Sequence, residues 1–447
     1  MAYATTTQLT AETTARKTAD TTETTARKAA DATLTTNLAT EVAARGAGDT
    51  SLSARMDALS AKFVAADARI TALEARVTKL ETPVVVVPPP VDPPPVVPPT
   101  TGTTVPASID ATGKTGVSAA LNAWIKSQPD GSTLIFPSGA KYMLDGDAGL
   151  NLAGKKHLTL VGTGCTLLNR TSGASGFSAS FFLQQSEDIL GYGFAVDGGN
   201  TATGTLNAKA QIDESISAIA IRGDCKRIEF HHINWDNIRG FGPIIGSDGG
   251  KTWPEDISIH DSLIRGGEMG VGIVAGRRVK IERCQINDSI DTAIDLEPDA
   301  SQVGGGGFED VLISDCDITG YGWGQSLTSW FVAACPQDAV LASCVMNGLT
   351  VTKNRVHTGA VGPVNGSQTG LGGLGIRADK TNAKKNFVIT DNVTTHTDTR
   401  SSSRSTMNLA NVENLTVTGN KQPSTGAQLL SDTGTTGTRV VSGNTTT

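Results

Sequence analysis

The densest group of carboxyl side chains in the sequence lies between residues 288 and 299. Asp295 and Glu297 flank Leu296, so on a β-strand both carboxyl groups point to the same face. Two carboxyl groups held about 5–9.5 Å apart can hydrolyse a glycosidic bond as acid and as base or nucleophile. We predict one outward groove that holds these carboxylates and a basic residue: Asp236, Asp291, Asp295, Glu297 and Arg239. The alternative is that all of them are turn and surface residues.

Aromatic residues make up only 4% of the chain, yet several gather between Ile318 and Leu349. They are Tyr321, Trp323, Trp330 and Phe331. Exposed rings would stack on flat, partly apolar ligands, whereas buried rings would pack this segment onto its own domain or a neighbouring subunit. Cys335 and Cys344 bracket part of the same segment. A bridge between them requires the strands to turn back, so the sequence leaves their redox state open.

Several other kinds of site are not indicated. The six His residues are scattered without the spacing of a metal site. We predict no cofactor, although the acidic stretch is a candidate for calcium binding without a diagnostic spacing. The net charge of −7 and the lack of a Lys/Arg run argue against a nucleic-acid partner. No run approaches the roughly 18 apolar residues of a membrane span, and residues 1–10 do not resemble a secretory signal.

The elements that would position these side chains repeat one motif after residue 107. Each unit has two apolar residues two positions apart, followed three positions later by a small or polar residue. The first apolar positions are residues 158, 189, 228, 257, 279, 311, 349, 387 and 415. Unequal spacing of a constant motif is typical of stacked coils with variable loops. We predict a mainly β chain with a parallel β-helix head at 107–447, capped by a helix at 116–127. An immunoglobulin-like or propeller head is the alternative.

The small or polar residue of each unit predicts a ladder inside the stack. Asn354, Asn392 and Asn420 would hydrogen-bond from one coil to the next, as stacked Asn residues do. Cys284 and Cys316 occupy the same register one coil apart. We predict that they are stacked, reduced core thiols, with a disulfide as the alternative.

Residues 52–82 carry a heptad pattern that predicts a parallel coiled coil. Basic g positions and acidic e positions attract each other only when the chains run parallel. Ile70 and Val77 at position a favour two strands, but Phe63 and Met56 do not follow that rule. The seam predicted to hold the oligomer consists of Leu52, Met56, Leu59, Phe63, Ile70, Leu73, Val77 and Leu80. A lone amphipathic helix packed on its own domain is the alternative.

Two further segments flank the heptads. In residues 1–51, a Glu-Thr-Thr-Ala-Arg-Lys sequence at Glu12 returns at Glu23, which predicts a helix with a weakly apolar Ala/Thr seam. Such a seam suits attachment to a larger assembly, and a disordered Thr/Ala tail is the alternative. Residues 83–106 contain runs of three Pro and predict a semi-rigid polyproline linker.

Three stretches of the head resemble the opening of pectate-lyase-like right-handed parallel β-helix proteins: 108–113, 129–137 and 156–162. The N-terminal repeats, heptads and Pro-rich linker resemble bacteriophage tail fibres, and the combination resembles a phage tailspike or minor tail protein. The resemblance implies a right-handed β-helix and a homotrimer, with a dimer as the alternative. It also implies a virion protein made in the host cytoplasm, joined to other tail or baseplate proteins by its N-terminus.

The same resemblance implies that the head meets a host-surface polysaccharide. It makes Arg239, Tyr321, Trp323 and Trp330 candidates for glycan contacts. Three functions stay open: receptor binding, depolymerisation of the glycan by a hydrolase or lyase, and a structural fibre without a glycan role. The polygalacturonase-type combination of Asn-Thr-Asp, Asp-Asp, Gly-His-Gly and Arg-Ile-Lys is absent as a set, which weakens the hydrolase hypothesis.

Overall fold

The computed structural model describes residues 5–38, 41, 101–146, 149–172, 178–205, 207–246, 252–298, 306–322, 331–335, 344–357, 376–378, 384–394, 407–422 and 430–446. The chain divides into two units, Met1–Pro95 and Val96–Thr447. The heptads predicted at 52–82 and linker residues 83–100 lie outside the described residues.

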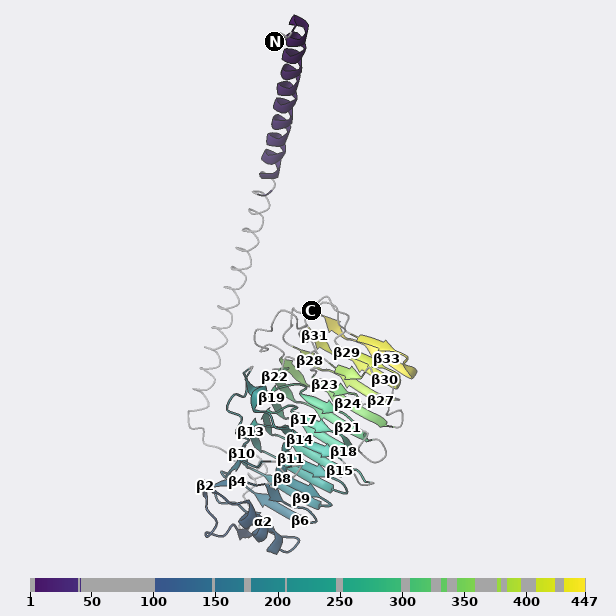
Figure 1. Ribbon diagram of the computed structural model, residues 1–447. Coiled ribbons are helices and arrows are strands. Elements are labelled where there is room, and N and C mark those ends of the chain that lie inside the picture. The colour runs from purple at the N-terminus through teal and green to yellow at the C-terminus, as the bar shows by residue number, and fades with distance from the viewer. Residues whose placement is uncertain are drawn as a thin grey trace, which may run out of the picture. The chain divides into compact units, whose positions relative to one another are not determined.

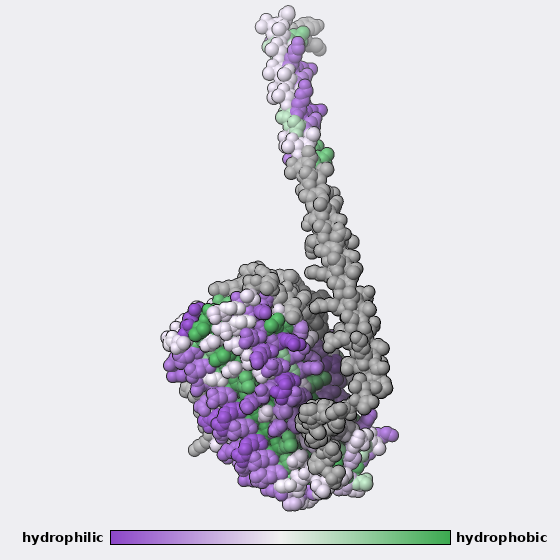
Figure 2. Space-filling model, turned by 180° about the vertical axis from the view of Figure 1, so that it is seen from behind, coloured by the Kyte–Doolittle hydropathy of each residue, from purple (hydrophilic) through white to green (hydrophobic). Residues whose placement is uncertain are grey.

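The described part of the first unit is helix α1 (residues 6–38), in which every side chain is exposed. Threonine hydroxyls donate to carbonyls one turn earlier, as from Thr13 to Leu9 at 2.8 Å. The repeated Glu-x-x-x-Arg spacing forms an ion pair one turn apart in each copy, at 2.7 Å for Glu12–Arg16. Figure 2 shows hydrophilic residues gathered along one side of this helix.

The second unit consists of three parallel sheets that run the length of the head (Figure 1). Sheet A contains β1 (Thr103–Thr104), β3 (Thr133–Ile135), β6 (Lys156–Val161), β9 (Glu187–Tyr192), β12 (Lys226–His231), β15 (Glu255–His260), β18 (Ala275–Glu282), β21 (Gly307–Ser314), β24 (Val345–Thr352), β27 (Lys384–Thr390), β30 (Val412–Thr418) and β33 (Thr436–Ser442).

Sheet B contains β2 (Thr112–Gly116), β4 (Lys141–Leu144), β7 (Thr166–Asn169), β10 (Ala195–Asp197), β13 (Asn234–Ile238), β16 (Leu263–Gly266), β19 (Gln285–Ser289), β22 (Asp317–Tyr321), β25 (Arg355–His357), β28 (Val393–Thr394), β31 (Lys421–Gln422) and β34 (Thr445–Thr446). Sheet C contains β5 (Leu150–Asn151), β8 (Ser178–Gln184), β11 (Ile216–Arg222), β14 (Phe241–Gly246), β17 (Val271–Ile273), β20 (Ile294–Leu296), β23 (Val332–Ala334), β26 (Ile376–Ala378), β29 (Met407–Ala410) and β32 (Leu430–Thr433).

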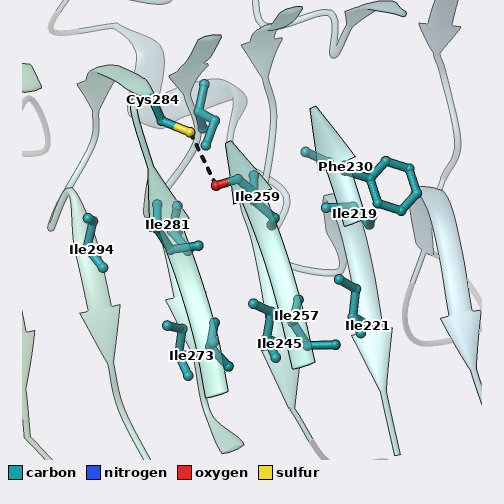
Figure 3. Close-up of a cluster of buried hydrophobic side chains, with 14 of the residues drawn as sticks. Ile219, Ile221, Phe230, Ile245, Ile257, Ile259, Ile273, Ile281, Cys284 and Ile294 are labelled. Atoms are coloured by element: carbon teal, nitrogen blue, oxygen red, sulfur yellow. Dashed lines mark hydrogen bonds between the residues drawn. The ribbon is translucent and has the colours of Figure 1, made fainter. Parts of the chain in front are cut away.

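Successive strands pass from sheet A to B to C and back to A, so each coil adds one strand to each sheet. The sequence-predicted apolar positions of sheet A pair with one another, as in Ile228↔Ile257 and Ile257↔Val279. All nine are at most 1% exposed. Figure 3 shows aliphatic side chains of sheet A, such as Ile257 and Ile281, packed with those of sheet C, such as Ile245 and Ile273. The predicted mainly β fold with a parallel β-helix head is therefore confirmed.

The corner between sheets A and B holds the predicted inward ladder. Asn354 Nδ2 donates to Asn392 Oδ1, and Asn392 Nδ2 donates to Asn420 Oδ1, each at 2.9 Å. Asn444 continues the ladder, because its Oδ1 accepts from Asn420 Nδ2 at 2.9 Å. Earlier coils carry Cys284 and Cys316 at this register, and both are buried free thiols. The prediction of stacked, reduced core cysteines is confirmed.

The first coil is covered by helix α2 (Ser118–Ser127), which buries Leu121, Trp124 and Ile125. The prediction placed this helix at 116–127, but Gly116 ends β2 and Val117 precedes the helix as its N-cap. A short 3₁₀ helix, η1 (Ala208–Gln211), lies between β10 and β11. β1 and the buried Val105 fall within the range 83–106 that the sequence analysis assigns to the linker.

Candidate functional site

The strands of sheet C carry one row of side chains that faces away from the core. In β20, Ile294 and Leu296 are buried in the core cluster, so Asp295 between them points outward. Its strand partners are Gly272 of β17 and Ala333 of β23, and Ala333 in turn pairs with Arg377 of β26. Asp295 therefore lies between two small residues, with a cation two coils further on.

Asp295 is only 7% exposed although it does not face the core. Burial is the main reason why the pKa of this carboxyl is raised well above its ordinary value. Glu297 acts in the same direction through its charge and a hydrogen bond to Asp295, and Asp291 acts through its charge. Arg377 opposes them without reversing the shift. Asp295 therefore stays protonated at pH values where an ordinary aspartate is ionised, and Glu297 is hydrogen-bonded to it.

The acidic group extends to a neighbouring coil at the corner between sheets B and C. The Asp291 amide donates to the Glu268 carbonyl at 2.8 Å, which stacks these two turns. Burial raises the pKa of Glu268, and Glu214 and Asp291 raise it further. Asp291 therefore couples electrostatically to both Glu268 and Asp295. Sequence reasoning missed Glu268 because it belongs to an earlier coil, but its position in the corresponding turn was a signal that could have found it.

Asp236 is not brought into this group. It lies on β13 of sheet B, whereas Asp295 lies on sheet C. Arg265 Nη1 donates to Asp236 Oδ1 at 2.8 Å, and Arg265 also pairs with Asp288 at 3.1 Å. The Asp236 carboxylate thus ties neighbouring coils together on another face of the head.

Arg239 connects three coils near the corner between sheets B and C. Its Nε donates to the Gly198 carbonyl and its Nη2 to the Thr171 carbonyl, both at 2.8 Å. Burial lowers the pKa of its guanidinium, and nearby Arg170 lowers it further. Two donor nitrogens of Arg239 are thus used by backbone carbonyls, so this side chain links neighbouring coils.

The aromatic candidates have different outcomes. Tyr321 was predicted to contact a glycan as an exposed ring, but it is 3% exposed and belongs to the hydrophobic core cluster. That prediction needs correction, because β22 directs this ring inward. Phe331 is also fully buried. Trp323 and Trp330 lie outside the described residues. Cys335 and Cys344 are buried and do not form a disulfide.

Sheet A presents a contrasting set of carboxylates on its outer surface. Arg278 pairs with Glu255 and, at 2.7 Å, with Asp256. Arg227 pairs in the same way with Glu187 and Asp188, and Arg283 pairs with Asp261 at 2.8 Å. The neighbouring guanidinium is the main reason why the pKa values of Asp188, Asp256 and Asp261 lie below the ordinary value.

Calcium binding stays a prediction. Within the described ranges, no group of three or more His, Cys, Asp or Glu side chains is arranged to hold a metal ion. Burial favours the protonated form of the Asp295 carboxyl group, whereas calcium ligands are ionised oxygens. The chemistry of this donor set therefore suits proton transfer better than it suits a cation.

Comparison with solved structures gives similar folds at low sequence identity. The tailspike protein of E. coli bacteriophage HK620, solved with a pentasaccharide, is 12% identical over 75% of this chain and 62% of that chain, with a TM-score of 0.48. Endo-xylogalacturonan hydrolase from Aspergillus tubingensis is 12% identical over 76% of this chain and 92% of that chain, with a TM-score of 0.44.

PfbA, a surface adhesin of Streptococcus pneumoniae, is 13% identical over 72% of this chain and 84% of that chain, with a TM-score of 0.39. A scan against protein-family models gives no match, and a search of curated proteins gives none either. These similarities concern the fold, so the chemistry of the site rests on this chain's own residues.

Proposed function

We propose that this chain is a tail protein of a bacteriophage virion whose β-helix head binds a polysaccharide of the host surface. The supporting observation is the outward row of sheet C, in which the acidic group around Asp295 lies two coils from the Arg377 cation on one side of the head. Strands in a sheet lie about 4.8 Å apart, a spacing that places hydrogen-bonding groups repeatedly along an extended polymer. The binding site we propose is centred on Asp295.

Cleavage of the polysaccharide is a second candidate, and the protonated state of Asp295 favours it. Hydrolysis of a glycosidic bond needs a carboxylic acid that keeps its proton near neutral pH and a carboxylate beside it. Asp295 fits the first role, since burial raises its pKa. Glu297 is the candidate for the second role, because it is more exposed than Asp295. Its hydrogen bond to Asp295 must break when the substrate binds, since a water molecule between the two carboxyl groups needs a separation of about 6.5–9.5 Å.

In the proposed hydrolysis, Asp295 transfers its proton to the glycosidic oxygen as the bond from that oxygen to the anomeric carbon breaks. A water molecule adds its oxygen to the anomeric carbon, and Glu297 accepts the proton that the water loses. The products are two shorter saccharides, one with a new reducing end. Asp291 contributes negative charge that favours the protonated form of Asp295 before the reaction.

The test uses the full chain with a panel of purified capsule, lipopolysaccharide and cell-wall polysaccharides from bacteria. Binding is measured by biolayer interferometry, and cleavage by new reducing ends and by the absorbance of unsaturated uronates. Binding without product supports the receptor function alone, while new reducing ends establish the hydrolase. Unsaturated uronates would show a lyase and contradict the assigned roles. Absence of binding to every polysaccharide would overturn the proposal and leave a structural fibre.

The rest of the chain fits attachment and assembly. We propose that residues 1–51 join the head to other tail or baseplate proteins and that residues 52–82 hold three parallel chains together. Light scattering of the full chain distinguishes a trimer from the alternative dimer. Substituting Leu59 and Leu73 by Asp should give monomers, and an unchanged mass would contradict the assignment to the heptad seam. Among the described residues, no helix has the length and apolarity of a membrane span.

A further inference from the structure

The outer face of sheet A carries a groove that is separate from the carboxyl group around Asp295. It encloses about 710 Å³ and crosses the strands from β12 to β24. Its floor is the central outward row of these strands, which includes Ser258, Lys280, Leu312 and Thr350. Asp295, by comparison, belongs to sheet C. The groove is therefore a second surface on the same head, with a different sheet as its base.

Two rows of longer side chains form the walls of the groove. One wall contains Asp256, Arg278 and Asp310, and the other contains His260, Glu282 and Arg283. The first wall is held by the Arg278–Asp256 pair at 2.7 Å. In the second, His260 Nε2 lies 3.1 Å from Glu229, and Arg283 is fixed by Asp261. Because these pairs hold the walls in place, a ligand would meet a preorganised surface.

A glycine opens the groove at its far end. The wall containing Arg278 follows a row of residues with left-handed backbone, in which φ lies between 50° and 74° on ten successive coils. Gly348 occupies this row on β24, where a Cβ atom would lie 2.5 Å from Asp310 Oδ1. The next two coils carry Asn386 and Asn414 in the same conformation. The missing side chain at Gly348 thus leaves the Asp310 carboxylate accessible.

The charges of the groove favour an uncharged, hydroxyl-rich ligand. Its lining contains four carboxylates (Glu229, Asp256, Glu282 and Asp310) and three cations (Arg278, Lys280 and Arg283), so neither sign dominates. Lys280 and Asp310 make no hydrogen bond or ion pair with another described residue and remain available as a donor and an acceptor. Ser258 and Thr350 add hydroxyl groups, and Leu312 offers an apolar surface between them. Sugars present hydroxyls at their edges and C–H groups on their faces, which matches this arrangement.

We propose that the sheet A groove is a second saccharide-binding site, which holds a neutral stretch of polysaccharide away from Asp295 and does not cleave it. The proposal goes beyond the proposed function, because it requires neither catalysis nor binding at sheet C. A second contact of this kind would raise the overall affinity for a long polymer through effective concentration.

The test measures the reactivity of Lys280 in the full chain. Reductive methylation with formaldehyde and mass spectrometry reports how fast its ammonium group reacts, with Lys385 and Lys421 as internal references. We expect a neutral polysaccharide that binds the chain to slow methylation of Lys280 about tenfold and to leave Lys421 unchanged. Thr350→Arg fills the floor of the groove and should abolish this protection, while Thr416→Arg, two coils further along the same row, should preserve it.

Gly348→Asn is a second variant that blocks the wall with a residue already tolerated on the following coils, and it should also remove the protection. Polysaccharide binding without protection of Lys280 would overturn the groove site while leaving the proposed function intact. Absence of any binding would overturn both. If Lys280 is already unreactive without glycan and Thr350→Arg lowers the mass measured by light scattering, the groove is an interface between copies of the chain and the proposal is wrong.

Discussion

Sheet A and sheet C both carry carboxyl groups on their outward sides, but the two sets are held in opposite ways. On sheet A, Asp188 and Asp256 lie beside arginines, and their pKa values fall below the ordinary value. On sheet C, Asp295 is buried with further carboxyl groups nearby, and its pKa rises. The same side chain is thus an ionised partner on one face and a protonated acid on the other.

The paired carboxylates of sheet A stabilise the fold, whereas the burial of Asp295 on sheet C does not. Paired carboxylates on sheet A link successive coils at the surface, where solvent and salt weaken each ion pair. Burial of Asp295 beside Glu297 opposes folding at neutral pH, because one group must keep a proton that water would remove. Perturbed carboxyl groups of this kind gather at functional sites. The contrast therefore directs experiments on catalysis to Asp295 of sheet C and experiments on ion-pair stability to the carboxylates of sheet A.

The largest expected effect is on catalysis at sheet C. Asp295→Asn removes the proposed acid but keeps its size, so the release of reducing ends should fall by about 10²–10⁴-fold. Asp236→Asn on sheet B is the matched control and should retain activity within a few-fold. Equal losses in both variants would show that carboxyl groups on the two sheets do not differ in the way proposed.

The second prediction concerns the corner between sheets A and B, which we assign to stability. Asn392→Ala removes the bonds to Asn354 and Asn420 and should cost about 1–3 kcal/mol for each buried group left unpaired. Asn347→Ala, which loses one exposed bond to Asn386, is the control and should cost far less. Chemical denaturation gives both values, and glycan binding by the folded variants should remain unchanged. Loss of binding in folded Asn392→Ala would place function at this corner.

A smaller effect is expected on the pH dependence of cleavage. The negative charge of Asp291 helps to raise the pKa of Asp295, so Asp291→Asn should lower that pKa. Since the acid must be protonated to act, the alkaline limb of the pH–rate profile should move to lower pH. Steady-state rates across the pH range measure this shift. A limb that stays in place would mean that a group other than Asp295 supplies the proton.

The smallest effects concern stability against pH, where the two sheets should behave oppositely. Asp256 has a lowered pKa in the folded state, so its contribution is present above its unfolded pKa of about 4 and is lost as pH falls. Asp295 has a raised pKa, so the fold loses stability as pH rises from about 4 through the folded value. Arg278→Ala should weaken this loss of stability on the acid side, because it removes the partner that lowers the pKa of Asp256.

Asp295→Asn should remove the loss on the alkaline side and make the protein more stable at neutral pH. Urea denaturation at several pH values measures both dependences. If Arg278→Ala and Asp295→Asn both change stability on the same side of the pH range, the proposed difference between the carboxyl groups of the two sheets is wrong.

Much of the scaffold could be predicted from sequence because its geometry repeats. The apolar pairs from Leu158 to Leu415 stand at a fixed position in successive coils, and Asn354, Asn392 and Asn420 follow them at a fixed distance, so one pattern located all of these residues. The inward-facing residues of sheet C were harder to predict, because its strands contain consecutive apolar residues and the sequence does not indicate which of them faces the core. Of the adjacent Ile244 and Ile245, for example, only Ile245 is fully buried.

The site could be predicted only where it is local in sequence. Periodicity showed that Asp295 and Glu297 share a direction, but it could not show that Asp295 is covered, because burial depends on the neighbouring coils. Glu268 and Arg377 reach the site from other coils, at separations that variable loops make irregular. Tyr321 was misplaced for a similar reason, since composition does not reveal whether an aromatic ring turns inward.

The left-handed row on sheet A has a consequence for how such a head can evolve. Ten coils adopt nearly the same backbone at this row, with side chains as different as His157, Asp188, Arg227 and Gly348. The local conformation is therefore set by the stack and not by the residue, and substitutions there change the surface while the backbone keeps its path. The side chains of this face can therefore be substituted one coil at a time during evolution without a change of fold.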